Sequence, residues 1–196
     1  MIGVIDYGAG NVGSVLRAIE YLGYPARAVQ DSEGLPEASK IVLPGQGHFG
    51  AMMASLQEKK MIEALRSQID AGKPFLGICL GLQALYEASD EAPNVAGFRL
   101  LPGHVKRFEG VFKIPHLGWN QLEIRRPEGL FRGVPNGSFA YFCHSYYGPV
   151  VPEAAAVTEY GQSFAAAIEM GSVAAVQFHP EKSGDVGLKV LENFLK

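Results

Sequence analysis

The chain has 196 residues, of which 47% are hydrophobic and 19% are charged, and its formal net charge is −3. A chain of this length buries roughly 70% of its unfolded surface, so we expect residues 1–196 to form a single domain without room for a second large one. The composition excludes a disordered chain. The slightly acidic net charge gives no sign of a basic surface that would bind nucleic acid or an anionic membrane.

The first half of the chain alternates apolar strands with amphipathic helices. Strands are predicted at residues 1–5, 26–30, 40–43 and 75–79. Helices are predicted at residues 12–22, 60–71 and 80–87, with Asn11 able to cap the first of them. This alternation indicates a parallel α/β sheet.

After about residue 95 the pattern changes to short β-rich segments separated by Gly or Pro. These segments lie at residues 100–108, 121–124, 139–146, 155–159, 165–169 and 173–178. A last helix is predicted at residues 186–195, with Val190, Leu191 and Phe194 on its buried face. The predicted fold class is α/β, a central, mostly parallel sheet flanked by helices, with antiparallel β additions in the C-terminal half.

Cys79 lies in the most informative segment, in which an apolar strand meets a helix through the pattern G-x-C-x-G. This is the pattern of a nucleophile elbow, where Gly77 and Gly81 permit a sharp turn and a close backbone approach. The helix N-terminus favours a thiolate, and the Leu80 amide is placed to bind an oxyanion. The alternative is a packed cysteine in a glycine-rich turn, and a base elsewhere in the chain decides between the two.

His179 and Glu181 supply that base and a carboxylate in the run Q-F-H-P-E-K, which follows an apolar strand. Pro180 fixes the backbone between them, and their side chains point the same way if the stretch is extended. Glu181 then holds the tautomer of His179 and stabilises its imidazolium. A cysteine, a histidine and a carboxylate are the parts needed for acyl transfer. The alternative is a loop histidine beside a solvated carboxylate.

Two glycine-rich loops follow strands in the first half of the chain. The loop Gly45–Gly47 can present backbone N–H groups to an anion, although a plain turn is the alternative. The run Gly8–Gly13 fits G-x-G-x-x-G, but no acidic residue clearly ends a second strand about 20 residues later. A dinucleotide site is therefore not predicted.

The remaining cysteine and histidines indicate no further chemistry. The other histidines show no metal spacing with Cys79 or Cys143, so neither a metal nor a cofactor is predicted. Cys143 lies in an alternating, strand-like run and is predicted to be a packed residue. Two cysteines are too few for a disulfide framework, and neither a targeting segment nor a long apolar span is recognisable. We therefore expect a cytoplasmic protein.

Together these segments resemble the class I, or triad-type, glutamine amidotransferases over nearly the whole chain. The cysteine and H-P-E motifs are typical of that class. Four motifs resemble, more narrowly, the glutaminase subunits of imidazole glycerol phosphate synthase: D-Y-G-A-G-N at 6–11, P-G-Q-G-H-F at 44–49, P-H-L-G-W-N at 115–120 and Y-F-C-H-S-Y-Y at 141–147. Three residues depart from that family's pattern, because Gln46 and Cys143 stand where valine is common and Leu117 where methionine is common.

The resemblance implies an enzyme that hydrolyses glutamine to glutamate and ammonia through a cysteine thioester. Ammonia would pass to a separate (βα)₈-barrel cyclase subunit, the heterodimer partner, which makes imidazole glycerol phosphate and aminoimidazole carboxamide ribotide in histidine biosynthesis. The family also implies that the oxyanion loop of the lone subunit is out of register, so that the partner controls its activity.

The resemblance further implies a role for each matching residue. Cys79 would be the nucleophile, His179 the base and acid, and Glu181 the orienting carboxylate. The oxyanion hole would be formed by Gly45, Gln46, Gly47 and Leu80. The glutamine pocket would be lined by Gln83, Glu91, His144, Ser145 and Tyr146. The side facing the cyclase would include Asn11, Trp119, Tyr141 and Lys182.

Three other functions stay open at this point. The motifs D-Y-G-A-G-N and H-L-G-W-N disfavour the glutaminase subunit of pyridoxal phosphate synthase, which is also small and separate. The intact Cys79, His179 and Glu181 disfavour a non-catalytic binding subunit on the same scaffold. A cysteine peptidase or related hydrolase would share the elbow but would leave the partner-side motifs unexplained.

Overall fold

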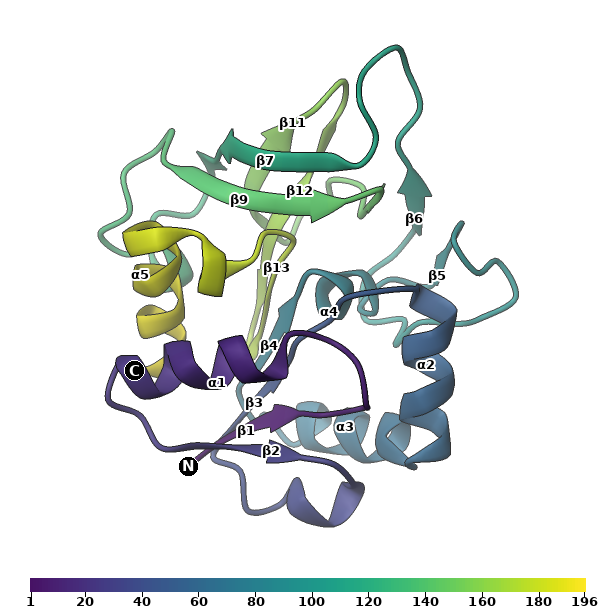
Figure 1. The fold of residues 1–196 in the computed structure, drawn as a ribbon, viewed down its shortest axis with the longest axis vertical. Helices are drawn as coiled ribbons and strands as arrows, with labels where there is room; N and C mark the ends of the chain where they lie inside the picture. The colour runs from purple at the N-terminus through teal and green to yellow at the C-terminus, as the bar shows by residue number, and fades with distance from the viewer.

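The computed structural model describes all 196 residues, which are built around one eight-stranded sheet of order β2-β1-β3-β4-β13-β12-β11-β8 (Figure 1). The strands from β2 to β13 in this order run parallel, and β12, β11 and β8 continue the sheet antiparallel. The sheet strands are β1 (Ile2–Ile5), β2 (Ala26–Val29), β3 (Lys40–Leu43), β4 (Phe75–Ile78), β8 (Glu123–Ile124), β11 (Ala154–Glu159), β12 (Ser163–Met170) and β13 (Val173–Val176). The predicted fold class is confirmed.

Helices cover both faces of the sheet. They are α1 (Val12–Tyr21), α2 (Phe49–Glu58), α3 (Met61–Asp70), α4 (Leu80–Gln83) and α5 (Gly184–Leu195), and 3₁₀ turns occupy Ser32–Gly34, Gly129–Phe131 and Pro180–Lys182. Alternate residues of the strands feed two separate cores. In β3, for example, Ile41 and Leu43 pack in the core beneath α2 and α3, whereas Val42 packs in the core beneath α1 and α5. This two-sided burial explains why the strands are continuously apolar.

Two smaller sheets lie beyond the carboxyl ends of the parallel strands. One is β10 (Tyr146–Tyr147), β6 (His104–Arg107) and β5 (Ala88–Ser89), and the other is the antiparallel pair β7 (His116–Gln121) and β9 (Phe139–His144). Figure 1 shows β7 and β9 lying across the end of the main sheet, above β4 and β13. The smaller sheets therefore stand over the edge at which the Cys79 elbow emerges.

The helices of the structure differ from the predicted ones in two places. The helix α2 was not predicted, although Phe49, Met52, Met53 and Leu56 follow helical spacing and are all buried. The helix predicted at residues 80–87 ends at Gln83, because the chain turns there and residues 84–101 fold back on it through backbone bonds such as Phe98 N–H to the carbonyl of Ala84. No helix combines the length and apolar character needed to cross a bilayer.

Candidate active site

Cys79 sits at a sharp turn between β4 and α4. Its φ of 55° and ψ of −105° lie outside the regions that a residue with a side chain ordinarily adopts. The turn is held because the Cys79 amide donates to the carbonyl of Val176 on the neighbouring strand, at 2.7 Å. The predicted elbow geometry is present, and the thiol lies beyond the carboxyl end of the parallel strands.

The glycines of the elbow are required by backbone contacts. A Cβ atom on Gly77 would overlap the carbonyl oxygen of Gly81, and one on Gly81 would overlap the carbonyl oxygen of Leu43. A Cβ atom on Gly45 would overlap the Leu80 side chain. The elbow and the beginning of the Gly45–Gly47 loop are thus packed backbone against backbone.

His179 and Glu181 lie side by side next to this elbow. The Nδ1 atom of His179 is 2.9 Å from Oε1 of Glu181, and their side chains are 2% and 1% exposed. The pair forms although the stretch is not extended throughout, because residues 180–182 form a 3₁₀ turn with His179 itself in extended geometry. With Nδ1 directed to Glu181, the other ring nitrogen, Nε2, is left for the thiol of Cys79.

The electrostatics of His179 favour its protonated form. Burial alone would lower the pKa of His179, but hydrogen bonds and charges from Cys79 and Glu181 outweigh burial and raise that pKa well above its usual value. Burial opposes the charged form of Glu181 as well, yet the bonds to His179 and Asn11 hold the pKa of Glu181 below its usual value. The arrangement supports an imidazolium between two acidic groups.

Asn11 was predicted as a helix cap and as a residue facing a partner, and the structure shows its side chain bonded within this site. Its side chain makes no capping hydrogen bond to α1. Instead Nδ2 of Asn11 donates to Oε1 of Glu181 at 3.1 Å, across 170 residues of sequence. Asn11 therefore helps to orient the carboxylate that orients His179.

The Gly45–Gly47 loop begins directly after β3 and lies beside the elbow. The Gln46 amide donates to the hydroxyl of Tyr7 at 3.4 Å, and burial raises the pKa of Tyr7 to about 12. Gly47 has a φ of 101°, and nothing lies within 4 Å of the position a Cβ atom would take. The Leu80 amide opens α4, where backbone N–H groups lack partners within the helix. The loop is therefore packed at Gly45 and open at Gly47.

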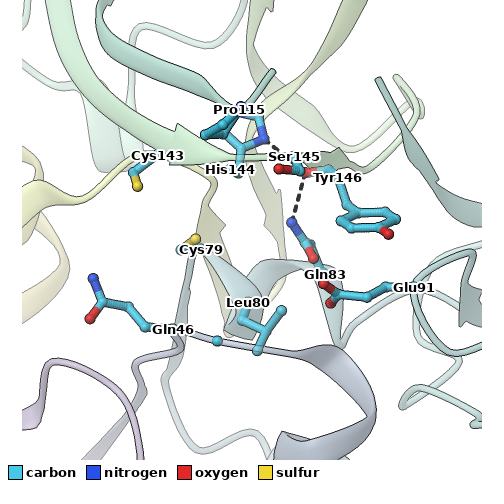
Figure 2. A pocket seen from close by; sticks show the side chains of 11 residues that line it. Gln46, Cys79, Leu80, Gln83, Glu91, Pro115, Cys143, His144, Ser145 and Tyr146 are labelled. Atoms are coloured by element: carbon cyan, nitrogen blue, oxygen red, sulfur yellow. Dashed lines mark hydrogen bonds between the residues drawn. The ribbon is translucent and has the colours of Figure 1, made fainter. Parts of the chain in front are cut away.

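A cavity of about 380 Å³ opens at the thiol. Its lining includes most of the residues predicted for the oxyanion hole and the glutamine pocket: Gln46, Gly47, Cys79, Leu80, Gln83, Glu91, His144, Ser145 and Tyr146, with Pro115 and Cys143 in addition (Figure 2). Gly45 is buried behind them and His179 is 2% exposed.

Two polar side chains leave unpaired acceptors at this cavity. Oε2 of Glu91 accepts from the Phe49 amide at 2.7 Å, at the N-terminus of α2, and its Oε1 makes no hydrogen bond within the chain. Nε2 of Gln83 donates to the Tyr146 carbonyl at 2.8 Å and to Oε1 of Gln177 at 3.2 Å. Oε1 of Gln83 is buried without any partner. The cavity thus offers the Glu91 carboxylate to a ligand that carries N–H groups, and the unpaired Gln83 oxygen lies buried beneath its lining.

His144 forms a wall of the cavity without offering a free ring nitrogen. Its Nδ1 lies 2.7 Å from the Tyr146 carbonyl, and its Nε2 lies 3.1 Å from Nδ1 of His116 (Figure 2 shows the first bond). Burial lowers the pKa of His144 to about 3 and that of His116 to about 4, so both are neutral at pH 7. Asn120 Nδ2 lies 3.2 Å from Nε2 of His116 and closes the chain of bonds.

The prediction that Cys143 is a packed residue is wrong. Cys143 is exposed, and its side chain points into the cavity near Cys79 (Figure 2). In β9 the residues Ala140, Phe142 and His144 face inward, so the alternation of a strand turns Tyr141 and Cys143 outward. Both cysteines are free thiols.

The outer face of β7 and β9 carries large exposed side chains. Leu117, Trp119 and Phe139 are 53%, 55% and 51% exposed. Trp119 pairs with Tyr141 across the two strands, and their rings meet edge to face with centroids 6.0 Å apart. Lys182 is exposed on the 3₁₀ turn that follows His179. We call Leu117, Trp119, Phe139 and Tyr141 the β7–β9 face.

The fold and the Cys79, His179 and Glu181 site define an amidotransferase of the triad type. In agreement, the family "Glutamine amidotransferase class-I" matches residues 3–196. Two solved structures share the fold over nearly the whole chain. A structure titled "Crystal structure of glutamine amidotransferase" has a TM-score of 0.76 at 22% identity, with 100% of this chain and 99% of that chain covered. The "Structure of PurLQS from Thermotoga maritima" has a TM-score of 0.78 at 20% identity, with 99% and 96% covered.

Curated relatives give a narrower family. Proteins named "Imidazole glycerol phosphate synthase subunit HisH" match from Moorella thermoacetica (49% identity, 98% of this chain, 93% of the relative), Syntrophotalea carbinolica (46%, 99% and 98%) and Desulfitobacterium hafniense (46%, 100% and 94%). The chain belongs to the HisH family of class I glutamine amidotransferases.

Proposed function

We propose that this chain hydrolyses glutamine to glutamate and ammonia as the glutaminase subunit of imidazole glycerol phosphate synthase, in histidine biosynthesis. The observation that carries the proposal is the strained Cys79 elbow beside the buried His179 and Glu181 pair, at the base of a cavity lined by unpaired acceptors. Membership in the HisH family supports the particular synthase. Because the relatives share that name, the pyridoxal phosphate synthase and peptidase alternatives lose their support.

Glutamine fits the polar groups of the cavity. Glu91 offers Oε1 to the ammonium group of an amino acid, and the charges of the two groups are complementary. The Gln83 side chain lines the same cavity and is held in place by its bonds to Tyr146 and Gln177. Ser145 and Tyr146 line the same cavity.

The reaction follows from the geometry in two halves. Cys79 attacks the side-chain amide carbon, and the Leu80 amide, with the Gly45–Gly47 loop, stabilises the oxyanion. The imidazolium of His179 donates its proton to the leaving nitrogen, so ammonia departs and a glutamyl thioester remains. The now neutral His179 takes a proton from water, which attacks the thioester and releases glutamate. Glu181 and Asn11 keep His179 oriented throughout.

The partner in this proposal is a (βα)₈-barrel cyclase that receives the ammonia and makes imidazole glycerol phosphate and aminoimidazole carboxamide ribotide. The β7–β9 face supports such an interface, because a cluster of exposed large apolar side chains is typical of protein-binding surfaces. Trp119 is an exposed part of this face, Lys182 is exposed on the turn after His179, and the half-buried Asn11 bonds to Glu181.

Two further assignments accompany this function. Residues 1–196 act as one glutaminase domain, which the match over residues 3–196 and the sheet shared by both cores support. The protein works in the cytoplasm, which two free cysteines, including a nucleophile that must stay reduced, support.

The decisive experiment compares two nitrogen sources with the Cys79→Ala variant bound to the cyclase. The variant should lose glutamine-dependent synthesis by more than about 10³-fold, because the residual rate rests on binding and the oxyanion site alone. Synthesis from an added ammonium salt should stay intact. Equal loss of both activities would overturn the assignment of Cys79 to the glutaminase half.

A further inference from the structure

Gln177 lies beside the elbow without a part in the reaction as described so far. It follows β13 directly, and in the parallel pairing Val176 stands opposite Ile78, so Gln177 is level with Cys79. Gln177 is completely buried, and its Nε2 lies 3.6 Å from Sγ of Cys79 as a hydrogen-bond donor. His179 is two residues further along the same segment.

The orientation of the Gln177 amide is fixed by its neighbour. Nε2 of Gln83 donates to Oε1 of Gln177, so the NH₂ group of Gln177 must face the other way, toward the sulfur. Gln83 is itself fixed, because its second N–H donates to the Tyr146 carbonyl. A flipped Gln177 amide would set two NH₂ groups against each other and would leave the sulfur facing a carbonyl oxygen.

The Tyr146 carbonyl is the fixed end of this chain of bonds. Its oxygen also lies 2.7 Å from Nδ1 of His144. Nε2 of His144 faces Nδ1 of His116, and Nε2 of His116 faces Nδ2 of Asn120. If Asn120 donates to Nε2 of His116, then Nδ1–H of each histidine donates onward and both rings stay neutral. One set of proton positions therefore satisfies every bond from Asn120 to Cys79.

We propose that Gln177 is a catalytic residue whose side-chain amide donates a hydrogen bond to the thiolate of Cys79 and stabilises the nucleophile in its ionised form. The inference rests on the proposed glutaminase function. A hydrogen bond to an ionised acceptor is roughly twice as strong as one between neutral groups, so this bond favours thiolate over thiol. The proton that leaves the sulfur resides on His179.

The test is the pH dependence of Cys79 alkylation by iodoacetamide in the full chain, with the Cys79 peptide quantified by mass spectrometry so that Cys143 does not interfere. Gln177→Met removes the donor, and Gln177→Glu keeps the shape but replaces the donor with an acceptor. Gln57→Met, at an exposed position of α2, makes the same chemical change elsewhere. The titratable side chains around the sulfur are kept in all variants: Tyr7, Glu91, Cys143, His144, His179 and Glu181.

The midpoint of alkylation should rise by about one pH unit in Gln177→Met, which corresponds to loss of one charged hydrogen bond, and by more in Gln177→Glu. In the complex with the cyclase, kcat of Gln177→Met for glutamine should fall about tenfold with KM changed less than threefold. Gln57→Met should match the wild type. A midpoint that stays in place overturns the proposal even if kcat falls, because a merely structural role lowers the rate without moving the midpoint.

A second measurement needs no change at Gln177. In the wild-type chain, the side-chain N–H resonances of Gln177 should shift over the titration of Cys79 and should not shift in Cys79→Ala. Resonances that behave alike in both proteins overturn the proposal. If the wild-type complex releases no ammonia from glutamine, the proposed function fails, while the alkylation midpoint and these resonances still decide the role of Gln177.

Discussion

Two glycine-containing turns leave neighbouring strands at the same edge of the sheet, and they are held very differently. At the β4 elbow, Gly77 and Gly81 have no room for a Cβ atom, and the Cys79 amide is bonded to Val176. After β3, only Gly45 is tightly packed, whereas Gly47 faces open space. The Gln46 amide is engaged by Tyr7. The proposed nucleophile is therefore held tightly by the fold, while the proposed oxyanion loop beside it has room at Gly47, and we expect control of the proposed reaction to lie in the loop.

The largest expected effect contrasts the two turns directly. Gly81→Ala should lower the free energy of unfolding by about 3 kcal/mol or more, because its Cβ atom would overlap the Leu43 carbonyl. Gly47→Ala should cost about 1 kcal/mol, since only its positive φ opposes it. Urea denaturation of both variants measures the difference. Equal losses would show that the elbow is no tighter than the loop.

The buried histidine pair at the cavity wall, His116 and His144, should make the stability of the protein depend on pH. His116 and His144 have pKa values lowered to about 4 and about 3 by burial, so the unfolded chain binds protons that the folded chain refuses once the pH falls below about 6.5. The free energy of unfolding should therefore be highest above that pH, and it should decrease as the pH falls from 6.5 toward 4.

The His116→Gln variant removes one of these two groups. The slope of stability against pH should decrease by up to about 1.4 kcal/mol per pH unit between pH 6 and pH 4.5. The exposed His104→Gln serves as the matched control. An unchanged slope in His116→Gln would mean that folding does not lower the pKa of His116.

The strain at Cys79 should appear as a stability difference between two inactive variants. Cys79→Gly should be more stable than Cys79→Ala by about 1 kcal/mol, because glycine tolerates a φ of 55° and a ψ of −105° whereas alanine does not. Thermal denaturation of the two proteins provides the comparison. If Cys79→Ala is the more stable protein, the elbow stores no strain at this residue.

The smallest effect concerns the bond that holds the loop. Tyr7→Phe removes the acceptor of the Gln46 amide and should raise the glutaminase rate of the lone chain about threefold to tenfold, which is the worth of one hydrogen bond. Tyr160→Phe, which loses a bond to the Lys113 carbonyl, is the control and should have no effect. A lower rate in Tyr7→Phe would assign Tyr7 to the competent state of the loop instead.

Local patterns predicted the fold and the turn and pairing geometry of Cys79, His179 and Glu181, because each depends on short stretches of sequence. The elbow at Cys79 and the pairing of His179 with Glu181 follow from turn chemistry and proximity along the chain. The helix α2 was missed although the spacing of Phe49 and Met52–Met53 is typical of one buried helix face. The end of the short α4 could not be predicted in this way, because apolar residues lie on every side of that segment and define no single helix face.

Contacts between residues far apart in the chain could not be predicted from the sequence. Nothing near Asn11 indicates that its side chain bonds Glu181, 170 residues away. Gln177 lies in the H-P-E segment, yet its bond to Cys79 depends on the pairing of β13 with β4. Cys143 is different, because the alternation of β9 places it on the same side as Tyr141, which was predicted to be exposed to a partner. A strict use of that period would have placed Cys143 correctly.

The central claim is a fixed nucleophile beside an adjustable oxyanion loop, and ammonia release from glutamine tests it most directly. The rate is measured for the purified chain alone and then with the cyclase subunit and its nucleotide ligand. The account predicts stimulation of at least roughly tenfold by the partner. A lone chain as active as the complex would contradict it, since the loop would then already be in register in the structure described here.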